Sequence, residues 1–245
     1  MKTAIVMVVY NQMKNWDWTK FSISNLRKYL PKEKIVVIDH NNIKEERDFL
    51  LSQQVTIIEN TGEKSHGAGL DLGVEWCRVN KFDAMVAIEP DCKITDRKWY
   101  DKITNEVDGG YYLAGVHRLD FGPIHPCGTC WSIDKIRFSF KPCLKSTELN
   151  DKEYLFLFNE KKYYDFLNYI GDNHPYVEEE NSFRDGCLFS YWVHRWDCGL
   201  RNWYDMASQG KERVVEVNDF LHYFCGSQST PLTYQIKSKK TKSFI

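Results

Sequence analysis

The chain has 245 residues, of which 42% are hydrophobic, 27% charged and 15% aromatic. This length fits one large domain or two small ones, and the composition excludes a disordered chain, a collagen and a coiled coil. The 33 basic and 34 acidic side chains leave a net charge of −1. The charge therefore gives no reason to expect a nucleic acid as partner.

The first half of the chain alternates between strand and helix patterns. Short apolar runs without polar alternation are typical of strands covered on both faces of a parallel sheet. They predict strands over residues 4–9, 35–38, 55–58, 84–88 and 111–116. The segments between them predict helices over residues 21–29, 45–51, 65–78 and 96–107. This order predicts an α/β fold with a mixed, mainly parallel sheet flanked by helices.

The pattern is less regular after residue 120. Two prolines, two glycines and two cysteines between Phe121 and Trp131 predict an irregular loop. Further on, we expect a helix within 149–170, a helix over 183–196 and a late strand over 214–217. No repeat or linker is visible, so we expect a single domain over 1–236 and a flexible basic tail over 237–245.

The sequence predicts a cytoplasmic protein. No apolar run approaches the roughly 18 residues of a membrane-spanning helix. The first residues resemble a secretion signal, but no small-residue cleavage site follows the apolar run that ends at Val9. The lysine-rich tail suggests weak contact with an anionic membrane surface, although a solvated tail is the simpler interpretation.

The eight cysteines include one close pair, Cys127 and Cys130, in a C-x-x-C spacing. A structural zinc site needs four ligands, and only distant residues such as His117, His125 or Cys143 would complete it. We therefore expect free, partly buried thiols, with metal binding by the pair as the alternative.

Polar residues follow four of the predicted strands. Because the carboxyl ends of parallel strands lie along one edge of a sheet, these residues predict a ligand site there; ordinary loop polarity is the alternative. The four segments are Tyr10–Asn11, Asp39–Asn41, Asn60–Gly62 and Glu89–Asp91.

Several common site motifs are missing from the sequence. The first strand is not followed by the glycine-rich turn of dinucleotide-binding enzymes. Neither the phosphate-binding G-x-x-x-x-G-K-[ST] nor the serine hydrolase motif G-x-S-x-G occurs. After these exclusions, the class of chemistry left for the strand ends is one based on carboxylates and a metal ion.

Glu89 and Asp91 place two carboxylates two residues apart, with Pro90 fixing the backbone between them. In an extended segment, side chains at this spacing lie on the same side. Hard oxygen ligands suit Mn²⁺ or Mg²⁺, which would bridge the phosphates of a nucleotide. An ordinary turn is the alternative.

The order of the motifs VVYN, IDHNN, ENTGEKSHGAGLDLG and IEPDC resembles nucleotide-sugar glycosyltransferases of the GT-A fold. The resemblance is closest to the inverting group that contains rhamnosyl- and polysaccharide-building enzymes. It spans residues 3–120 and, more sparsely, 180–230. The family's D-x-D metal motif corresponds to Glu89–Asp91, with Glu89 in place of the usual first aspartate.

The resemblance implies roles for individual residues. Asp91 and His222 would bind the metal ion; a packed core histidine is the alternative for His222. Asp185 would be the general base; an acid that stabilises a helix N-terminus is the alternative for this residue. Asp39 would bind the uracil or ribose. The full donor-binding set is Tyr10, Asn11, Asp39, Asn41, Asn60, Gly62, Gly67, Asp71 and Glu89. Trp131 and Trp203 are weaker candidates for stacking on an acceptor sugar.

These observations predict a metal-dependent glycosyltransferase that moves a sugar from a nucleoside-diphosphate sugar to a hydroxyl of a glycan or glycoconjugate acceptor. The expected stereochemistry is inversion, with an aspartate as base. Two alternatives stay open. A sugar nucleotidyltransferase shares the sheet, although this chain lacks the G-x-G-x-R segment near the first strand. Because Glu89 stands where the family usually has an aspartate, the chain could also be a non-catalytic homologue.

Overall fold

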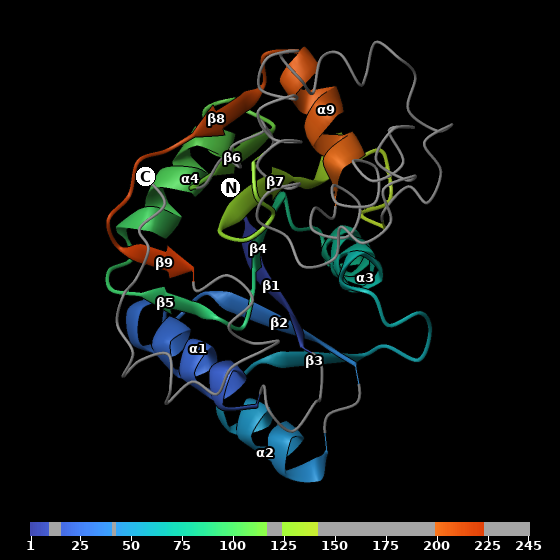
Figure 1. Ribbon diagram of the computed structural model, residues 1–245, viewed down its shortest axis with the longest axis vertical. Helices are drawn as coiled ribbons and strands as arrows, with labels where there is room; N and C mark the ends of the chain where they lie inside the picture. The colour runs from blue at the N-terminus through green and yellow to red at the C-terminus, as the bar shows by residue number, and fades with distance from the viewer. Residues whose placement is uncertain (10–15, 41–42, 117–123, 142–198, 223–245) are drawn as a thin grey trace, which may run out of the picture.

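The computed structural model describes residues 1–9, 16–40, 43–116, 124–141 and 199–222 (Figure 1). Its main sheet has seven strands in the order β3-β2-β1-β4-β7-β6-β8, and β5 and β9 form a second, two-stranded sheet. The strands are β1 (Thr3–Val9), β2 (Lys34–Asp39), β3 (Thr56–Glu59), β4 (Ala84–Ile88), β5 (Cys92–Ile94), β6 (Leu113–Gly115), β7 (Thr129–Ser132), β8 (Glu212–Val214) and β9 (Phe220–His222).

The sheet is mixed but mainly parallel, as the sequence predicts. Strands β3, β2, β1 and β4 are parallel neighbours, and β6 is parallel to β8. Strand β7 is antiparallel to both β4 and β6. The predicted α/β class with a flanked, mainly parallel sheet is therefore confirmed for the described part of the chain.

Helices cover both faces of the sheet (Figure 1). They are α1 (Trp16–Tyr29), α2 (Lys44–Ser52), α3 (His66–Val79), α4 (Lys98–Asp108) and α9 (Leu200–Ser208), with a short 3-10 helix η1 (Ile133–Lys135). Val6 of β1 is buried with Leu70 of α3, whereas Met7 is buried with Leu26 of α1 in a second cluster. Because both faces are covered, the strand sequences are apolar without alternation.

Helix α3 packs closely on β1, and two glycines make this approach possible. A Cβ at Gly69 would lie 2.6 Å from Val8 Cγ1, and one at Gly73 would lie 2.6 Å from Val6 Cγ1. The helix begins after Ser65, whose hydroxyl accepts a hydrogen bond from the Ala68 N–H at 3.2 Å. This packing places the first turn of α3 beside the carboxyl ends of the strands.

The structure differs from the sequence predictions in the second half of the chain. An irregular loop is expected over 121–131; in its described part, residues 125–128 are irregular, but β7 begins at Thr129. Helix α9 and strand β5 were not predicted. The helices expected within 149–170 and over 183–196, and the basic tail, lie outside the described residues. No helix in the described ranges has the length and hydropathy needed to cross a membrane.

Candidate functional site

The carboxyl ends of β1, β2 and β3 are connected by backbone hydrogen bonds. The His40 N–H donates to the Val9 carbonyl at 3.0 Å, and the Asn60 N–H donates to the Asp39 carbonyl at 2.9 Å. Strand β4 runs parallel to β1 and ends directly before Glu89. The expected convergence of Asp39, Asn60 and Glu89 on one edge of the sheet is therefore present.

Glu89, Asp91 and His222 meet at this edge and form what we call the carboxylate–histidine cluster. His222 Nε2 lies 3.1 Å from Glu89 Oε2 and 3.3 Å from Asp91 Oδ1. One ligand atom from each residue lies within 4.8 Å of the other two. The cluster thus joins residues that are 133 positions apart in the sequence.

The small sheet explains how His222 reaches the two carboxylates. Glu89 and Asp91 lie in the turn between β4 and β5, and β9 pairs antiparallel with β5, with His222 directly opposite Cys92. The backbone of β5 is also held to α1, because the Ile94 N–H donates to Asn25 Oδ1 at 2.5 Å. The β5–β9 pairing therefore places His222 beside the turn that carries both acids.

The cluster is largely shielded from solvent. The side chains of Asp91 and His222 are 0% and 1% exposed, and that of Glu89 is 21% exposed. Burial by itself would lower the pKa of His222, but the negative charge and the hydrogen bonds around the ring outweigh burial and raise this pKa well above its usual value. Burial would likewise raise the pKa of the Glu89 carboxyl, yet the neighbouring His222 holds it below the usual range.

These three residues fit a hard divalent cation. Two carboxylate oxygens and one imidazole nitrogen are donors that Mn²⁺ accepts, and Mg²⁺ binds carboxylates in the same way. Buried carboxylates are costly unless a positive charge compensates them. A protonated His222 can provide that charge, and a divalent cation would take its place as His222 gives up its proton and becomes a ligand. Glu89 is the member of the cluster that faces solvent, so a phosphate ligand would approach from its side.

Two further histidines lie next to the cluster; neither was among the predicted donor or metal residues, and His125 was considered only as a distant zinc ligand. His66, in the first turn of α3, has Nδ1 3.9 Å from Glu89 Oε1. The ring of His125 lies 4.9 Å from that of His222, centroid to centroid. The only sequence signal for His66 was its place at the start of a helix that follows a strand end.

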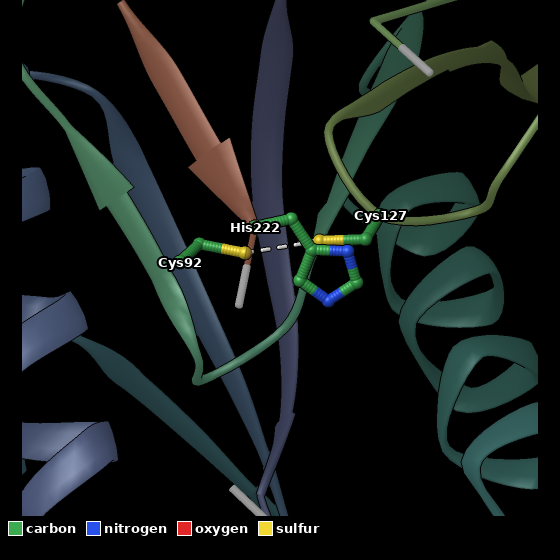
Figure 2. A group of neighbouring side chains, drawn as sticks. All are labelled: Cys92, Cys127 and His222. Carbon is green, nitrogen blue, oxygen red and sulfur yellow. Dashed lines mark hydrogen bonds between the residues drawn. The ribbon is translucent and has the colours of Figure 1, made fainter. Parts of the chain in front are cut away.

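A pair of thiols also borders the cluster. The sulfur atoms of Cys92 and Cys127 are 3.1 Å apart, and Figure 2 shows them beside the ring of His222. The C-x-x-C spacing suggested Cys127 and Cys130 as partners, but Cys127 contacts Cys92 instead, because β5 lies next to the loop that carries Cys127. Cys77, Cys92, Cys127 and Cys130 are buried, as expected, and none of the four is in a disulfide.

Asp39 occupies the predicted position at the end of β2, and it is fully buried. Its Oδ2 accepts a hydrogen bond from Arg47 Nε at 2.9 Å, and Arg47 Nη2 lies 3.2 Å from Glu59 Oε1. Arg47 thereby links the ends of β2 and β3. Contact of Asp39 with a nucleotide base or ribose stays a prediction.

Asn60 organises the turn after β3. Its Oδ1 accepts from the Gly62 N–H at 2.9 Å, and its Nδ2 donates to the Glu63 carbonyl at 2.6 Å. The same Nδ2 lies 3.2 Å from His40 Nδ1. Both Asn60 and Gly62 therefore shape the strand end, and their contact with a donor stays a prediction.

Gly67 and Asp71, on α3, both contact the segment 139–141. A Cβ at Gly67 would clash with the Phe140 carbonyl oxygen. Asp71 Oδ1 accepts from the Phe140 N–H at 2.7 Å, and its Oδ2 accepts from Ser139 Oγ at 2.5 Å. These contacts attach the segment to the helix, and donor binding by either residue stays a prediction.

The two tryptophans proposed as sugar-stacking platforms are core residues, so that prediction is wrong. Trp131 is 1% exposed and packs edge-on against Phe140, and Trp203 is 4% exposed. Their rings are occupied by the apolar core between the sheet and its helices. Four other predicted site residues lie outside the described part of the chain and stay predictions: Tyr10, Asn11, Asn41 and Asp185.

No protein-family model and no curated protein matches the sequence. Solved structures match at low identity. A mannosyltransferase from Pyrobaculum calidifontis, solved with GDP-Man and Mn²⁺, is 12% identical with a TM-score of 0.40, over 49% of this chain and 36% of that chain. TarS from S. aureus is 12% identical with a TM-score of 0.46, over 79% of this chain and 71% of that chain.

A cytidylyltransferase from Leptospira borgpetersenii is 13% identical with a TM-score of 0.47, over 89% of this chain and 77% of that chain. The matching structures thus include nucleotide-sugar transferases, the class of protein that the sequence resembles. This chain spans only 36% of the length of the mannosyltransferase. At this identity and these TM-scores, an activity has to be inferred from the residues of the chain itself.

Proposed function

We propose that this protein is a metal-dependent glycosyltransferase that moves a sugar from a nucleoside-diphosphate sugar to a hydroxyl acceptor. The observation that carries the proposal is the carboxylate–histidine cluster, whose ligand atoms lie within 4.8 Å of one another. It occupies the edge of the parallel strands, where ligands bind in open α/β sheets. The motif order of the sequence, which resembles GT-A glycosyltransferases, supports the same activity.

Asp91 and His222 are the proposed metal ligands, with Glu89 on the solvent side. The bound ion, Mn²⁺ or Mg²⁺, would neutralise the charge that develops on the nucleoside diphosphate as it leaves. The burial of Asp91 and His222 keeps water away from these two ligands and fixes their positions. Glu89, which is partly exposed, is placed to orient the donor beside them.

The acceptor hydroxyl has a high pKa and needs a base within hydrogen-bond reach. We propose Asp185 for this role, because the resemblance implies an acidic residue at this place in the chain. An aspartate base that activates the acceptor for direct attack would give inversion at the anomeric carbon. Asp185→Asn should lower turnover by about 100-fold or more while the donor affinity changes little.

The reaction class can be tested with a panel of UDP-, GDP- and dTDP-sugars in the presence and absence of Mn²⁺. A glycosyltransferase releases the nucleoside diphosphate, and we expect this release to depend on the metal ion. Release of pyrophosphate from a nucleoside triphosphate and a sugar phosphate would instead indicate a sugar nucleotidyltransferase. Binding of the nucleotide sugar by calorimetry without turnover would indicate a non-catalytic homologue.

The variant Asp91→Asn tests the metal site directly. It removes one charge from the cluster without changing the side-chain volume, so we expect metal-dependent turnover to fall by about 100-fold or more, which corresponds to about 3 kcal/mol. Glu59→Gln is the matched control, because Glu59 lies at the same sheet edge but outside the cluster. Unchanged Mn²⁺ dependence in Asp91→Asn would remove Asp91 from its proposed role.

A further inference from the structure

We propose that Cys92, Cys127 and His222 form a second cation site, which binds one thiophilic divalent ion such as Zn²⁺. The two sulfur atoms and a ring nitrogen of His222 all lie within 4.8 Å of one another (Figure 2). Two cysteine sulfurs and one imidazole are ligands that zinc prefers, whereas Mn²⁺ and Mg²⁺ prefer oxygen. The site therefore differs from the carboxylate–histidine cluster in the ion it selects.

Three separate segments bring these ligands together. Cys92 begins β5, and His222 lies opposite it on β9. Cys127 comes from the loop before β7, where Gly128 adopts a positive φ of 72°, which favours glycine. β-pairing and a tight turn thus bring ligands from distant segments together, and the two sulfurs, 3.1 Å apart, would separate slightly to bind one ion.

The position of Cys127 is fixed by two hydrogen bonds, each between a backbone N–H and a side chain. Its Sγ accepts from the Glu89 N–H at 3.2 Å, and its own N–H donates to His125 Nδ1 at 3.1 Å. The thiol is thereby attached to the turn that carries the acids of the cluster. In zinc sites with three protein ligands, a water molecule or substrate fills the fourth position.

Disulfide formation is the other chemistry open to two neighbouring thiols. Cys92 and Cys127 are 1% and 0% exposed, and a disulfide between them would need a two-electron oxidant, whereas zinc binding needs none. Burial raises the pKa of the Cys92 thiol to about 11 and that of Cys127 well above its usual value. Zinc supplies the charge that stabilises both thiolates, and the two thiols and the protonated His222 each release one proton to solvent as they bind the ion.

The two sites share His222, so they should exclude one another. A neutral imidazole has one nitrogen with a lone pair to donate, because the other nitrogen carries a proton, so His222 can bind only one ion at a time. Zinc bound by the thiols would therefore displace Mn²⁺ from the carboxylates. This consequence rests on the proposed function of the cluster, whereas zinc binding itself does not.

Cobalt is a suitable probe, because Co²⁺ occupies zinc sites and absorbs in the near ultraviolet when thiolates bind it. We expect the full chain, kept reduced with a phosphine, to develop this thiolate band with one equivalent of Co²⁺ and to lose it when Zn²⁺ is added. Cys92→Ala and Cys127→Ala should abolish the band. Loss of a supporting residue weakens metal sites by about 10–100-fold, so loss of a direct ligand should cost at least as much affinity for Zn²⁺.

Cys130→Ala is the matched control, since Cys130 is equally buried but lies outside the ligand set. It should keep both the band and the zinc affinity. Absence of a thiolate band in the unmodified chain would overturn the proposal, and so would a band that persists in the double variant Cys92→Ala/Cys127→Ala. Circular dichroism shows whether each variant is folded.

X-ray absorption of the zinc-loaded, unmodified chain provides a test that needs no variant. We expect two sulfur neighbours, and a shell of only nitrogen and oxygen would overturn the proposal. Release of Mn²⁺ on addition of Zn²⁺, followed by electron paramagnetic resonance, tests the exclusion between the sites. A thiolate zinc site in a chain without transferase activity would contradict only the proposed function, and activity without thiolate binding would contradict only this inference.

Discussion

His222 contributes to both proposed cation sites, although its immediate sequence gives little sign of either. It lies between aromatic and aliphatic residues, a pattern that is equally typical of a core histidine. Its contacts at 3.1 Å with Glu89 and 3.3 Å with Asp91 arise from strand pairing over a long sequence separation. At the scale of one residue, the chemistry of the side chain and its tertiary neighbours together define the role.

His40 shows a second effect of the environment on a single residue. Burial lowers its pKa to about 4, and the positive charges of His66 and Lys64 act in the same direction, whereas Asp39 opposes them. The amide of Asn60 lies 3.2 Å from Nδ1, so this nitrogen accepts a hydrogen bond from Nδ2 in the neutral ring. Protonation of Nδ1 would break that hydrogen bond.

This environment predicts a pH dependence of stability. The unfolded chain binds a proton at His40 below about pH 6.5, whereas the folded chain does so only below about pH 4. The free energy of unfolding should therefore fall as the pH drops from about 6.5 to 4, and His40→Gln should reduce that fall. Chemical denaturation across this range, referenced to pH 7.5, measures how the free energy of unfolding changes with pH in the unmodified chain and in His40→Gln. An equal pH dependence in the two proteins would contradict the role of His40.

At the scale of elements, the packing of α3 against β1 determines where the site lies. The helix carries His66 at its start, and its glycines bring it onto the strand whose end borders the cluster. Gly69 is more crowded than Gly73, because a Cβ there would lie 2.6 Å from Val8 Cγ1 and also 2.9 Å from His40 Nε2. The absence of a side chain at this position therefore fixes the distance between helix and sheet.

We expect Gly69→Ala to destabilise the protein. Overpacking costs about 1–3 kcal/mol, which outweighs a gain of up to about 1 kcal/mol from the better helix propensity of alanine. Gly62→Ala is the control, because its Cβ would meet Asn60 Oδ1 at an ordinary 3.5 Å. Chemical denaturation measures both variants.

A double-mutant cycle identifies the contact responsible. Val8→Ala should cost less free energy of unfolding in the Gly69→Ala background than in the unmodified chain, because it removes the methyl groups that the new Cβ meets. Strictly additive effects would show that crowding against Val8 is not the cause.

At the scale of the whole molecule, the carboxylate–histidine cluster connects the main sheet to the small sheet. Glu89 and Asp91 follow β4, and His222 ends β9. These residues come together only in the folded chain. A cation that binds them should therefore stabilise the fold as well as serve the proposed reaction.

We accordingly expect Mn²⁺ to raise the Tm. At 100 times its Kd, the ion should add about 2.7 kcal/mol to the free energy of unfolding, or roughly 5–10 °C for a chain of this size. Thermal unfolding followed by circular dichroism measures the shift, which should vanish in Asp91→Asn and persist in Glu59→Gln. A Tm that does not respond to Mn²⁺ would contradict metal binding by the cluster.

The sequence by itself determined the mainly parallel sheet and the edge where a site would form. Buried strands such as 84–88 are short apolar runs, and polar residues follow them directly in the sequence. The strands and the polar strand ends could therefore be predicted from local sequence alone. It also indicated the two acids of the E-P-D triplet, because their spacing is local.

Only the tertiary structure decided which residues meet at that edge. The pairing of β5 with β9 brings His222 to Asp91, and it places Cys92 rather than Cys130 beside Cys127. Strand β7, antiparallel within a parallel sheet, carries no apolar run long enough to predict it. These contacts depend on pairing between segments far apart in the chain, and hydrophobic periodicity reports only on neighbours within one element.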